Sequence, residues 1–417
     1  MASQENSAPR KLQFGIQVRY ASRPGELEPF PSPFSGYSDR VKRELGREDR
    51  RAYQAQALQS NGLQSGLELP AVSESGCSHE SFRDYAPLEI LAGGNVRIMD
   101  PSTIPLAKRD GKNIRSKYWL IRSGLEHERP KAFVGWYNTE LNSPILPEEG
   151  ATYGFSRVAR ALCTIYMANK IHQSRSCVMH FHVSPVEGLE VRQAQRAATL
   201  VFLLEVPLLF RLSIRTRGNL PLELERGATF VLQNREMWPE EEVFADEVET
   251  WLSRSFLQTH RDKMRQLWGA LDIEGVGKMI EADQKVFSPF DKTALRVDCH
   301  LHPDGTRDYS LEFSHAQASF NMPFVNNWTK LLLLIVKLAD LPCQKYSKLV
   351  EKLWEIVDGV TDKSTIWPQL LKELNAQTPK TWNYSIDEAY WATRVRENMD
   401  PMNDYPGVGF GHMAMAE

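Results

Sequence analysis

Residues Ser176 to Pro185 read Ser-Cys-Val-Met-His-Phe-His-Val-Ser-Pro, which is the alternation of a half-buried β-strand. His180 and His182 are two residues apart, so a strand places both imidazoles on one face. Helical patterns flank the stretch at 155–166 and 191–212. A strand that presents two imidazoles between two packed helices can be the floor of an active site. It can also hold two histidines that only hydrogen-bond within a sheet, and spacing alone favours this second interpretation because His-x-His is common without chemistry.

Other segments of the chain show the same two periodicities. Residues 12–20 alternate strictly, with apolar residues at the even positions and Gln13, Gly15, Gln17 and Arg19 at the odd ones. Shorter strands are predicted at 137–141, 228–233, 295–300 and 309–315, and apolar helices at 323–338 and 349–357. Antiparallel strands mixed with long helices predict an α+β fold.

Composition shifts along the chain indicate its organisation. Residues 1–10 are predicted to be a mobile tail, and 11–340 the main α+β domain. Within it, about 22–115 is rich in Pro, Gly, Ser and charge and has little core-forming pattern, so it reads as a peripheral insertion. Residues 341–417 are predicted to be a helical extension that ends in a loose tail.

The overall charge and the cysteines limit the classes of function. A formal charge of −3 over 417 residues gives no global attraction to nucleic acid or to an anionic membrane. The five cysteines are widely spread and form no Cys-x-x-Cys pair, which argues against a disulfide framework and a structural zinc site. The polar start lacks the apolar core of a signal peptide, and the most apolar run, 197–212, is interrupted by Glu205, Pro207 and Arg211. The sequence therefore predicts a cytoplasmic protein with no membrane partner.

Four short stretches carry most of the polar residues that could do chemistry. They are Phe-Gly-Ile-Gln-Val-Arg-Tyr at 14–20, Tyr-Asn-Thr-Glu-Leu-Asn-Ser-Pro-Ile-Leu at 137–146, the stretch at 177–183 with the helix that ends near Arg217-Gly218-Asn219, and Leu-Glu-Phe-Ser-His at 311–315. In this order and spacing they resemble the amidoligase family, a branch of the carboxylate–amine ligase superfamily related to glutamine synthetase and glutamate–cysteine ligase. The resemblance spans roughly residues 11–340 without the insertion.

The resemblance implies an antiparallel sheet curved into an open, glutamine-synthetase-like funnel that holds ATP and magnesium on its polar face. In such ligases ATP phosphorylates a carboxylate, and an amine displaces the phosphate to form an amide. By this resemblance the catalytic residues are His180, His182, Glu140 and Glu312, and the metal ligands are Glu140, His182 and Glu312. The residues implied to bind substrate or phosphate are Arg19, Gln17, Arg217, Asn219 and His315.

The chain departs from the family pattern at several of these positions. Gln17 and Arg19 stand where two glutamates are expected, and Ser314 stands where an arginine is expected. Because an arginine cannot bind a cation, the usual magnesium–ATP site cannot exist here in its usual form. Glu140, His180, His182 and Glu312 remain, enough for one metal ion or for acid–base chemistry without a metal.

Each of these residues also has a purely structural interpretation. Glu140 before its turn can be a solvated or capping carboxylate, and Glu312 can be a cross-strand ion-pair partner. Arg217-Gly218-Asn219 is a plain helix C-cap with glycine at the stop. Arg19 can be a surface charge on an edge strand.

Three functions are consistent with the sequence. The first is a divergent amide-bond-forming enzyme that acts on a small-molecule carboxylate and an amine, with Arg19 on phosphate or carboxylate, in small-molecule biosynthesis. The second is a transferase that takes a pre-activated acyl donor, such as an aminoacyl-tRNA or a thioester, and needs no ATP. The third is an inactive binding protein with the same fold. We expect the first, and the overall negative charge counts against tRNA.

Overall fold

The computed structural model describes most of the chain outside the insertion. The described residues are 10–23, 50–51, 53–68, 97–99, 118–124, 136–152, 155–168, 171–172, 177–213, 221–233, 248–288, 291–301, 306–378, 382 and 385–398. The predicted tail 1–10 lies outside them except for Arg10, which forms a 2.6 Å ion pair with Glu190. The last part of the predicted C-terminal tail, 399–417, and most of the predicted insertion also lie outside the described residues.

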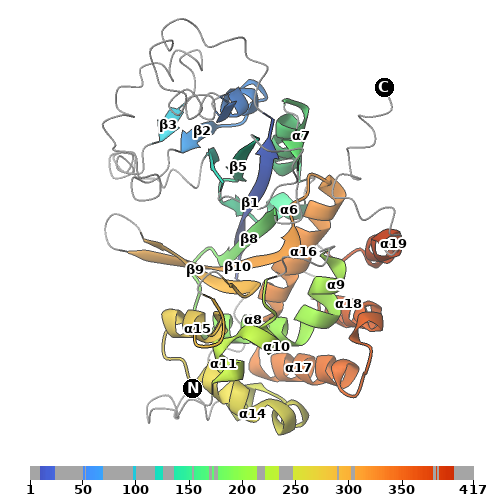
Figure 1. Cartoon of the computed structure of the whole chain (residues 1–417). Helices are drawn as coiled ribbons and strands as arrows, with labels where there is room; N and C mark the ends of the chain where they lie inside the picture. The colour runs from blue at the N-terminus through green and yellow to red at the C-terminus, as the bar shows by residue number, and fades with distance from the viewer. Residues whose placement is uncertain are drawn as a thin grey trace, which may run out of the picture.

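Within these residues, ten strands form one sheet in the order β3-β2-β4-β5-β1-β8-β10-β9, with β6 and β7 paired to β1 (Figure 1). Pairing is antiparallel except that β2 runs parallel to β3 and β4. The strands are β1 Leu12–Ser22, β2 Ser65–Glu68, β3 Arg97–Met99, β4 Trp119–Ser123, β5 Tyr137–Asn142, β6 Leu146–Pro147, β7 Ile171–His172, β8 Val178–Pro185, β9 Leu295–Leu301 and β10 Arg307–Gln317. The α+β prediction is confirmed, and the strands that carry the four motifs lie in one sheet.

Alternation in β1, β8 and β10 gives the sheet an apolar face. The even residues of β1 from Leu12 to Tyr20 are buried, as the strict period predicts. Ile16 pairs with Phe181 of β8, which pairs in turn with Phe313 of β10. These cross-strand rows form one continuous hydrophobic core with the helices that cover this face.

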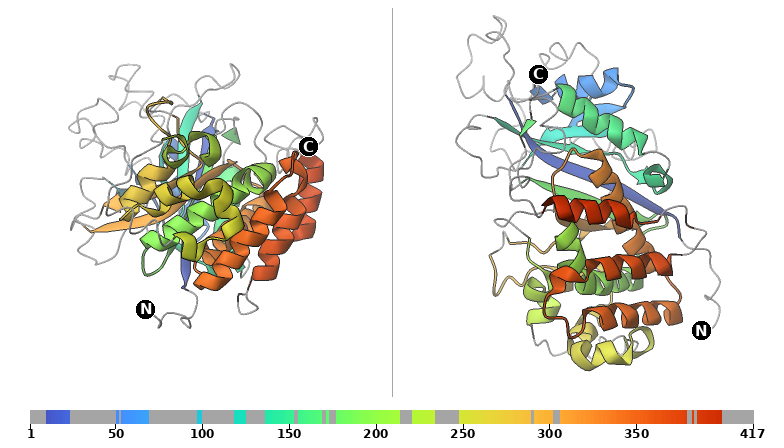
Figure 2. Two further views of the ribbon diagram at one scale, coloured as in Figure 1. Left: turned by 90° about the horizontal axis from the view of Figure 1, so that it is seen from below. Right: turned by 90° about the vertical axis from the view of Figure 1, so that its right-hand side faces the viewer.

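The helices gather on the apolar side of the sheet. Helix α16 packs against β1, β8 and α8, and α17 packs against α8 and α14. Figure 1 shows α7 and α16 on the same side of β1 and β8, and in the right-hand view of Figure 2 the orange and red C-terminal helices stack below them. The longer helices are α7 Ser156–Ala168, α8 Val191–Leu204, α14 Arg254–Trp268, α15 Ile273–Ile280, α16 Met322–Leu338, α17 Cys343–Val357, α18 Trp367–Gln377 and α19 Glu388–Asn398.

The predicted helix 191–212 is interrupted once. After α8, Glu205–Leu209 forms a π-helical turn, and α9, Phe210–Leu212, completes the segment. Pro207 lies in this turn and has no N–H to donate, so a regular α-helical ladder cannot pass through it. The turn keeps Glu205 buried, with its Oε2 accepting a 2.5 Å hydrogen bond from the Leu224 N–H.

One predicted strand is wrong. Residues 228–233 contain α11, Thr229–Leu232, a single helical turn, and only Ala228 makes a bridge, to Ala282. A short run rich in Thr, Phe and Val suits a strand, but such a run can also form a buried helical turn. Here the helical turn places Phe230 in the core beside Phe202. No helix in the described part of the chain has both the length and the apolar character needed to span a bilayer.

Candidate active site

The face of the sheet opposite the core is lined by polar residues in register. We call it the polar face. Across the strand pairs, Arg19 of β1 is opposite Glu140 of β5, Gln17 is opposite His180 of β8, and Gly15 is opposite His182. Glu312 of β10 is next to His182, and Arg296 and Asp298 of the edge strand β9 are opposite Glu312 and Ser310. Side chains alternate between the two faces along every strand. The residues of β5 and β8 that pair with the odd residues of β1 therefore lie on the same face as those residues.

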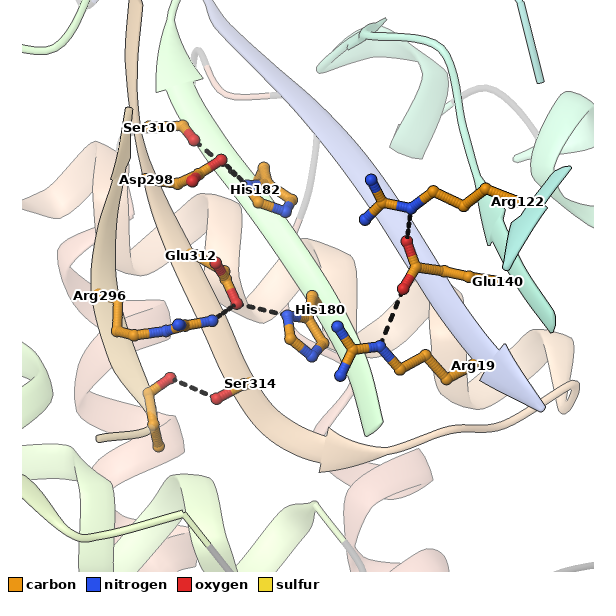
Figure 3. A network of polar contacts seen from close by, with 11 residues as sticks. Arg19, Arg122, Glu140, His180, His182, Arg296, Asp298, Ser310, Glu312 and Ser314 are labelled. Atoms are coloured by element: carbon orange, nitrogen blue, oxygen red, sulfur yellow. Dashed lines mark hydrogen bonds and ion pairs between the residues drawn. The ribbon is translucent and has the colours of Figure 1, made fainter. Parts of the chain in front are cut away.

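On one side of the polar face, two arginines hold a buried glutamate (Figure 3). Arg19 Nε donates to Glu140 Oε2 at 2.9 Å, and Arg122 Nε of β4 contacts the other carboxylate oxygen. Asn142 Nδ2 donates to the same carboxylate at 3.1 Å. Burial favours the neutral acid, but the charges of Arg122 and Arg19 outweigh it and hold the pKa of Glu140 below its ordinary value.

On the other side, His180 Nδ1 and Arg296 both contact Oε1 of Glu312. Burial raises the pKa of Glu312, but His180 and Arg296 reverse this, so its pKa lies below the ordinary value. Burial also lowers the pKa of His180, and the charge of Arg19 adds to that effect against the opposing carboxylate. At neutral pH the pair is therefore a carboxylate and a neutral imidazole.

A neutral His180 that donates from Nδ1 to Glu312 keeps Nε2 unprotonated. In Figure 3 the imidazole lies between Glu312 and the guanidinium of Arg19. A base held in one tautomer by a carboxylate is the arrangement that general base catalysis uses. The pair is thus able to accept a proton from a group that reaches Nε2 of His180.

A cavity of about 210 Å³ lies on the polar face beside these two clusters. This volume has room for several water molecules or a small organic molecule. The lining comprises Gln13, Phe14, Gly15, Ile16, Gln17, Leu120, Arg122, Asn142, Ser143, Ile145, His182, Ser184, Asp298, His300, Asp308, Tyr309 and Ser310. Arginine, amides and apolar side chains lie toward β4, β5 and β1, while carboxylates and imidazoles lie toward β8, β9 and β10.

The donor set for magnesium is only partly the predicted one. His182, Asp298 and Glu312 each offer one ligand atom within 4.8 Å of the other two. Glu140 is not in this set, because its carboxylate is engaged by Arg19 and Arg122. Two carboxylates next to an imidazole can hold a divalent ion, whereas magnesium prefers oxygen ligands alone. The residues fit a metal ion, with Asp298 in the position that the sequence analysis gave to Glu140.

The other predicted residues fall in different places. Gln17 and His182 line the cavity, while Arg19, Glu140, His180 and Glu312 form the two clusters beside it. His315 is fully buried on the core face, where its Nε2 is 3.0 Å from Glu205, and so it does not reach the polar face. Arg217 and Asn219 lie outside the described residues.

Four side chains of the site were not predicted from the sequence. Arg122, Asn142, Arg296 and Asp298 all contact predicted residues. Alternation along 295–300 was the available signal, since it places Arg296, Asp298 and His300 on one face.

Comparison of the chain with models of protein families, with curated proteins and with solved structures finds no match.

Proposed function

We propose that the protein is a divergent amide-bond-forming enzyme that joins a small carboxylate to an amine on the polar face. In this proposal the mainly antiparallel sheet is the wall of a glutamine-synthetase-like funnel, and the reaction uses ATP. The observation that supports it most is the register of the four motif strands. β1, β5, β8 and β10 bring Arg19, Glu140, His180 and Glu312 to a single face, although they are far apart in sequence.

The division of charge across the cavity supports a carboxylate and an amine as substrates. The guanidinium of Arg122 lines the cavity and suits a carboxylate or phosphate oxygen. Asp308 lines the opposite side and suits an ammonium group. His180, held by Glu312, is the proposed base that removes the proton of the attacking amine.

ATP would supply the activation of the carboxylate by forming an acyl phosphate. The three arginines that reach the polar face, Arg19, Arg122 and Arg296, provide the positive charge that a phosphate group requires. Arg19 stands where the family pattern has a glutamate. Guanidinium groups would therefore bind the phosphates here to a greater extent than in the family pattern.

One observation favours a second candidate, a transferase that uses a pre-activated acyl donor. Gln17 and Arg19 of β1 stand where the family pattern has two glutamates, and Glu140 is held by two arginines instead of being available to a cation. A donor that arrives as an ester or a thioester needs no magnesium–ATP end. Such an enzyme would keep the base His180 and the cavity but would have no magnesium–ATP site.

A product assay separates these candidates. The purified protein is incubated with a panel of amino acids and polyamines as carboxylates and amines, with and without magnesium–ATP, and amides are detected by mass spectrometry. The ligase forms amide and ADP only when ATP, a carboxylate and an amine are all present. Amide formed from thioesters without ATP indicates the transferase. If no panel member gives amide under either condition, the inactive binding protein is the better account.

A further inference from the structure

We infer that His182, Asp298 and Glu312 hold a divalent transition-metal ion, such as Mn²⁺ or Zn²⁺, in the wall of the cavity. The three residues come from β8, β9 and β10, which are neighbours in the sheet. The binding of the ion does not depend on the proposed function; only its use in amide formation does.

The distances suit a metal ion after small side-chain adjustments. One ligand atom from each residue lies within 4.8 Å of the other two, and Nδ1 of His182 is 3.4 Å from Oδ2 of Asp298. Ligand atoms around an ion with bonds of about 2.0–2.2 Å are separated by little more than 3 Å. The His182–Asp298 pair already has nearly this spacing, and the set as a whole has to contract around an ion. Ser310 Oγ, 3.3 Å from the same imidazole nitrogen, adds a hydroxyl oxygen next to it.

The surroundings of Glu312 are those of a supported metal ligand. Its Oε1 is held by His180 and Arg296, which leaves Oε2 as the atom for an ion. Hydrogen bonds to the second oxygen of a ligating carboxylate orient it and are a regular feature of metal sites. In Figure 3 the side chains of His182, Asp298 and Glu312 converge from adjacent strands.

The ligand types indicate which ions fit. An imidazole with two carboxylates favours Mn²⁺, Fe²⁺ or Zn²⁺ over Mg²⁺, which prefers oxygen ligands. Asp298 and Glu312 bring two negative charges, and Arg296 offsets one of them. A divalent ion therefore enters a site with net negative charge.

An ion has a route to the site. Asp298 is about half exposed, with 48% of its side-chain surface accessible, and His182 is 26% accessible. Both line the cavity, whereas Glu312 lies behind them at 7%. The proposed ion would face the cavity, where a bound metal could polarise an acyl or phosphoryl oxygen as a Lewis acid.

Calorimetry on the full chain tests the inference without ATP or substrates. Chelator-treated protein is titrated with Mn²⁺, Zn²⁺ and Mg²⁺, and Co²⁺ absorption, compared between the wild type and His182→Gln, reports whether the coordination of the ion depends on this imidazole. We expect one saturable site that binds Mn²⁺ and Zn²⁺ at least about tenfold more tightly than Mg²⁺. Asp298→Asn should weaken binding by about a hundredfold. Loss of a residue that only hydrogen-bonds to a ligand typically costs about 10- to 100-fold in affinity, and loss of a ligand itself should cost at least as much.

His300→Gln is the matched control, because His300 lines the same cavity from β9 but is not one of the three ligands. It should bind Mn²⁺ within about twofold of the wild type, while His182→Gln, a second test variant, should lose the Co²⁺ signal. The inference is overturned if the wild type binds none of these ions saturably, if Asp298→Asn and His182→Gln bind as tightly as the wild type, or if Mg²⁺ binds most tightly. Because the assay contains no substrate, absence of amide formation would leave this result unaffected.

Discussion

Arg19 Nε lies 2.9 Å from Glu140 Oε2, across the pairing of β1 and β5. The arginine stands at a position where the family pattern has a glutamate, and its guanidinium makes an ion pair with a glutamate that was expected to bind metal. Together with Arg122, the contact makes Glu140 the centre of a buried ion-pair cluster, so both of its carboxylate oxygens are engaged by guanidinium groups. Two guanidinium groups around one carboxylate leave this side of the polar face with a net positive charge.

The buried cluster should contribute measurably to stability. Glu140 has 2% of its side-chain surface accessible, so removing one of its arginines leaves a poorly compensated charge. We expect Arg19→Ala to lower the free energy of unfolding by roughly 2–4 kcal/mol in urea titrations. Arg226→Ala, which breaks the exposed 3.1 Å pair with Glu223, is the control and should cost less than about 1 kcal/mol. Equal effects of the two variants would show that the cluster is no stronger than a surface pair.

The pairing of His180 with Glu312 should matter for rate more than for binding. In the product assay, we expect His180→Ala and Glu312→Gln each to lower the rate by about a hundredfold, because each removes part of the proposed base. Glu187→Gln, on the exposed turn after β8, is the control and should keep the wild-type rate. Wild-type rates in both His180→Ala and Glu312→Gln would remove this pair from the chemistry.

His260 should make the fold less stable in acid. Its ring lies 4.9 Å from that of Trp354 and about as close to Phe202 and Phe256, and burial lowers its pKa from 6.5 to about 4. Between these two pH values the unfolded chain binds a proton that the folded chain does not. The free energy of unfolding should therefore fall as the pH falls from about 6.5 to about 4.

Burial is the largest cause of the lowered pKa of His260, and charges of both signs act beside it. Lys263 and Lys363 lower its pKa, and Glu225 and Asp358 raise it. Because other groups also titrate in this range, the measured quantity is the difference between the wild type and His260→Phe in chemical denaturation at several pH values. The variant should lose less stability toward pH 4 than the wild type. Parallel curves would contradict the assignment.

Two glycines test how tightly the segment after α9 is packed. A Cβ on Gly227, in α10 Leu224–Gly227, would come within 2.7 Å of Leu222 Cβ. Gly227→Ala should therefore destabilise the fold by about 1–3 kcal/mol in thermal or urea unfolding. Gly150→Ala, in α6 Glu149–Thr152, has no atom within 4 Å of the added Cβ and should be neutral or stabilising by up to about 1 kcal/mol. Equal losses in both variants would contradict this account of the packing.

The sequence predicts which face of a central strand each residue occupies. It does not predict which residues of the adjacent strands lie opposite. Strict alternation placed Gln17 and Arg19 on one face of β1 and Phe14 and Ile16 on the other. Which residues oppose them depends on strand order and register, which single strands do not encode, and so Arg296 and Asp298 were missed.

Alternation along 311–315 places His315 on the core face, whereas the family resemblance implied that it binds substrate or phosphate. It is two residues from Phe313 and therefore shares the core face with it, away from Glu312. A bulge between Phe313 and Ala316 shifts the pairing with β8 at this point but leaves His315 against Glu205. The π-helical turn that holds Glu205 has no local signal beyond Pro207.

The central claim, that the polar face binds magnesium–ATP for ligation, is tested most directly by calorimetric titration of magnesium–ATP into the purified protein. We predict saturable binding to the wild type and its loss in Arg19→Glu, because that substitution places a negative charge where a phosphate contact is proposed. Binding that is absent from the wild type would contradict the ATP-dependent account. Binding that appears only in Arg19→Glu would contradict it as well, and would indicate a protein that has lost the site by the single exchange at position 19.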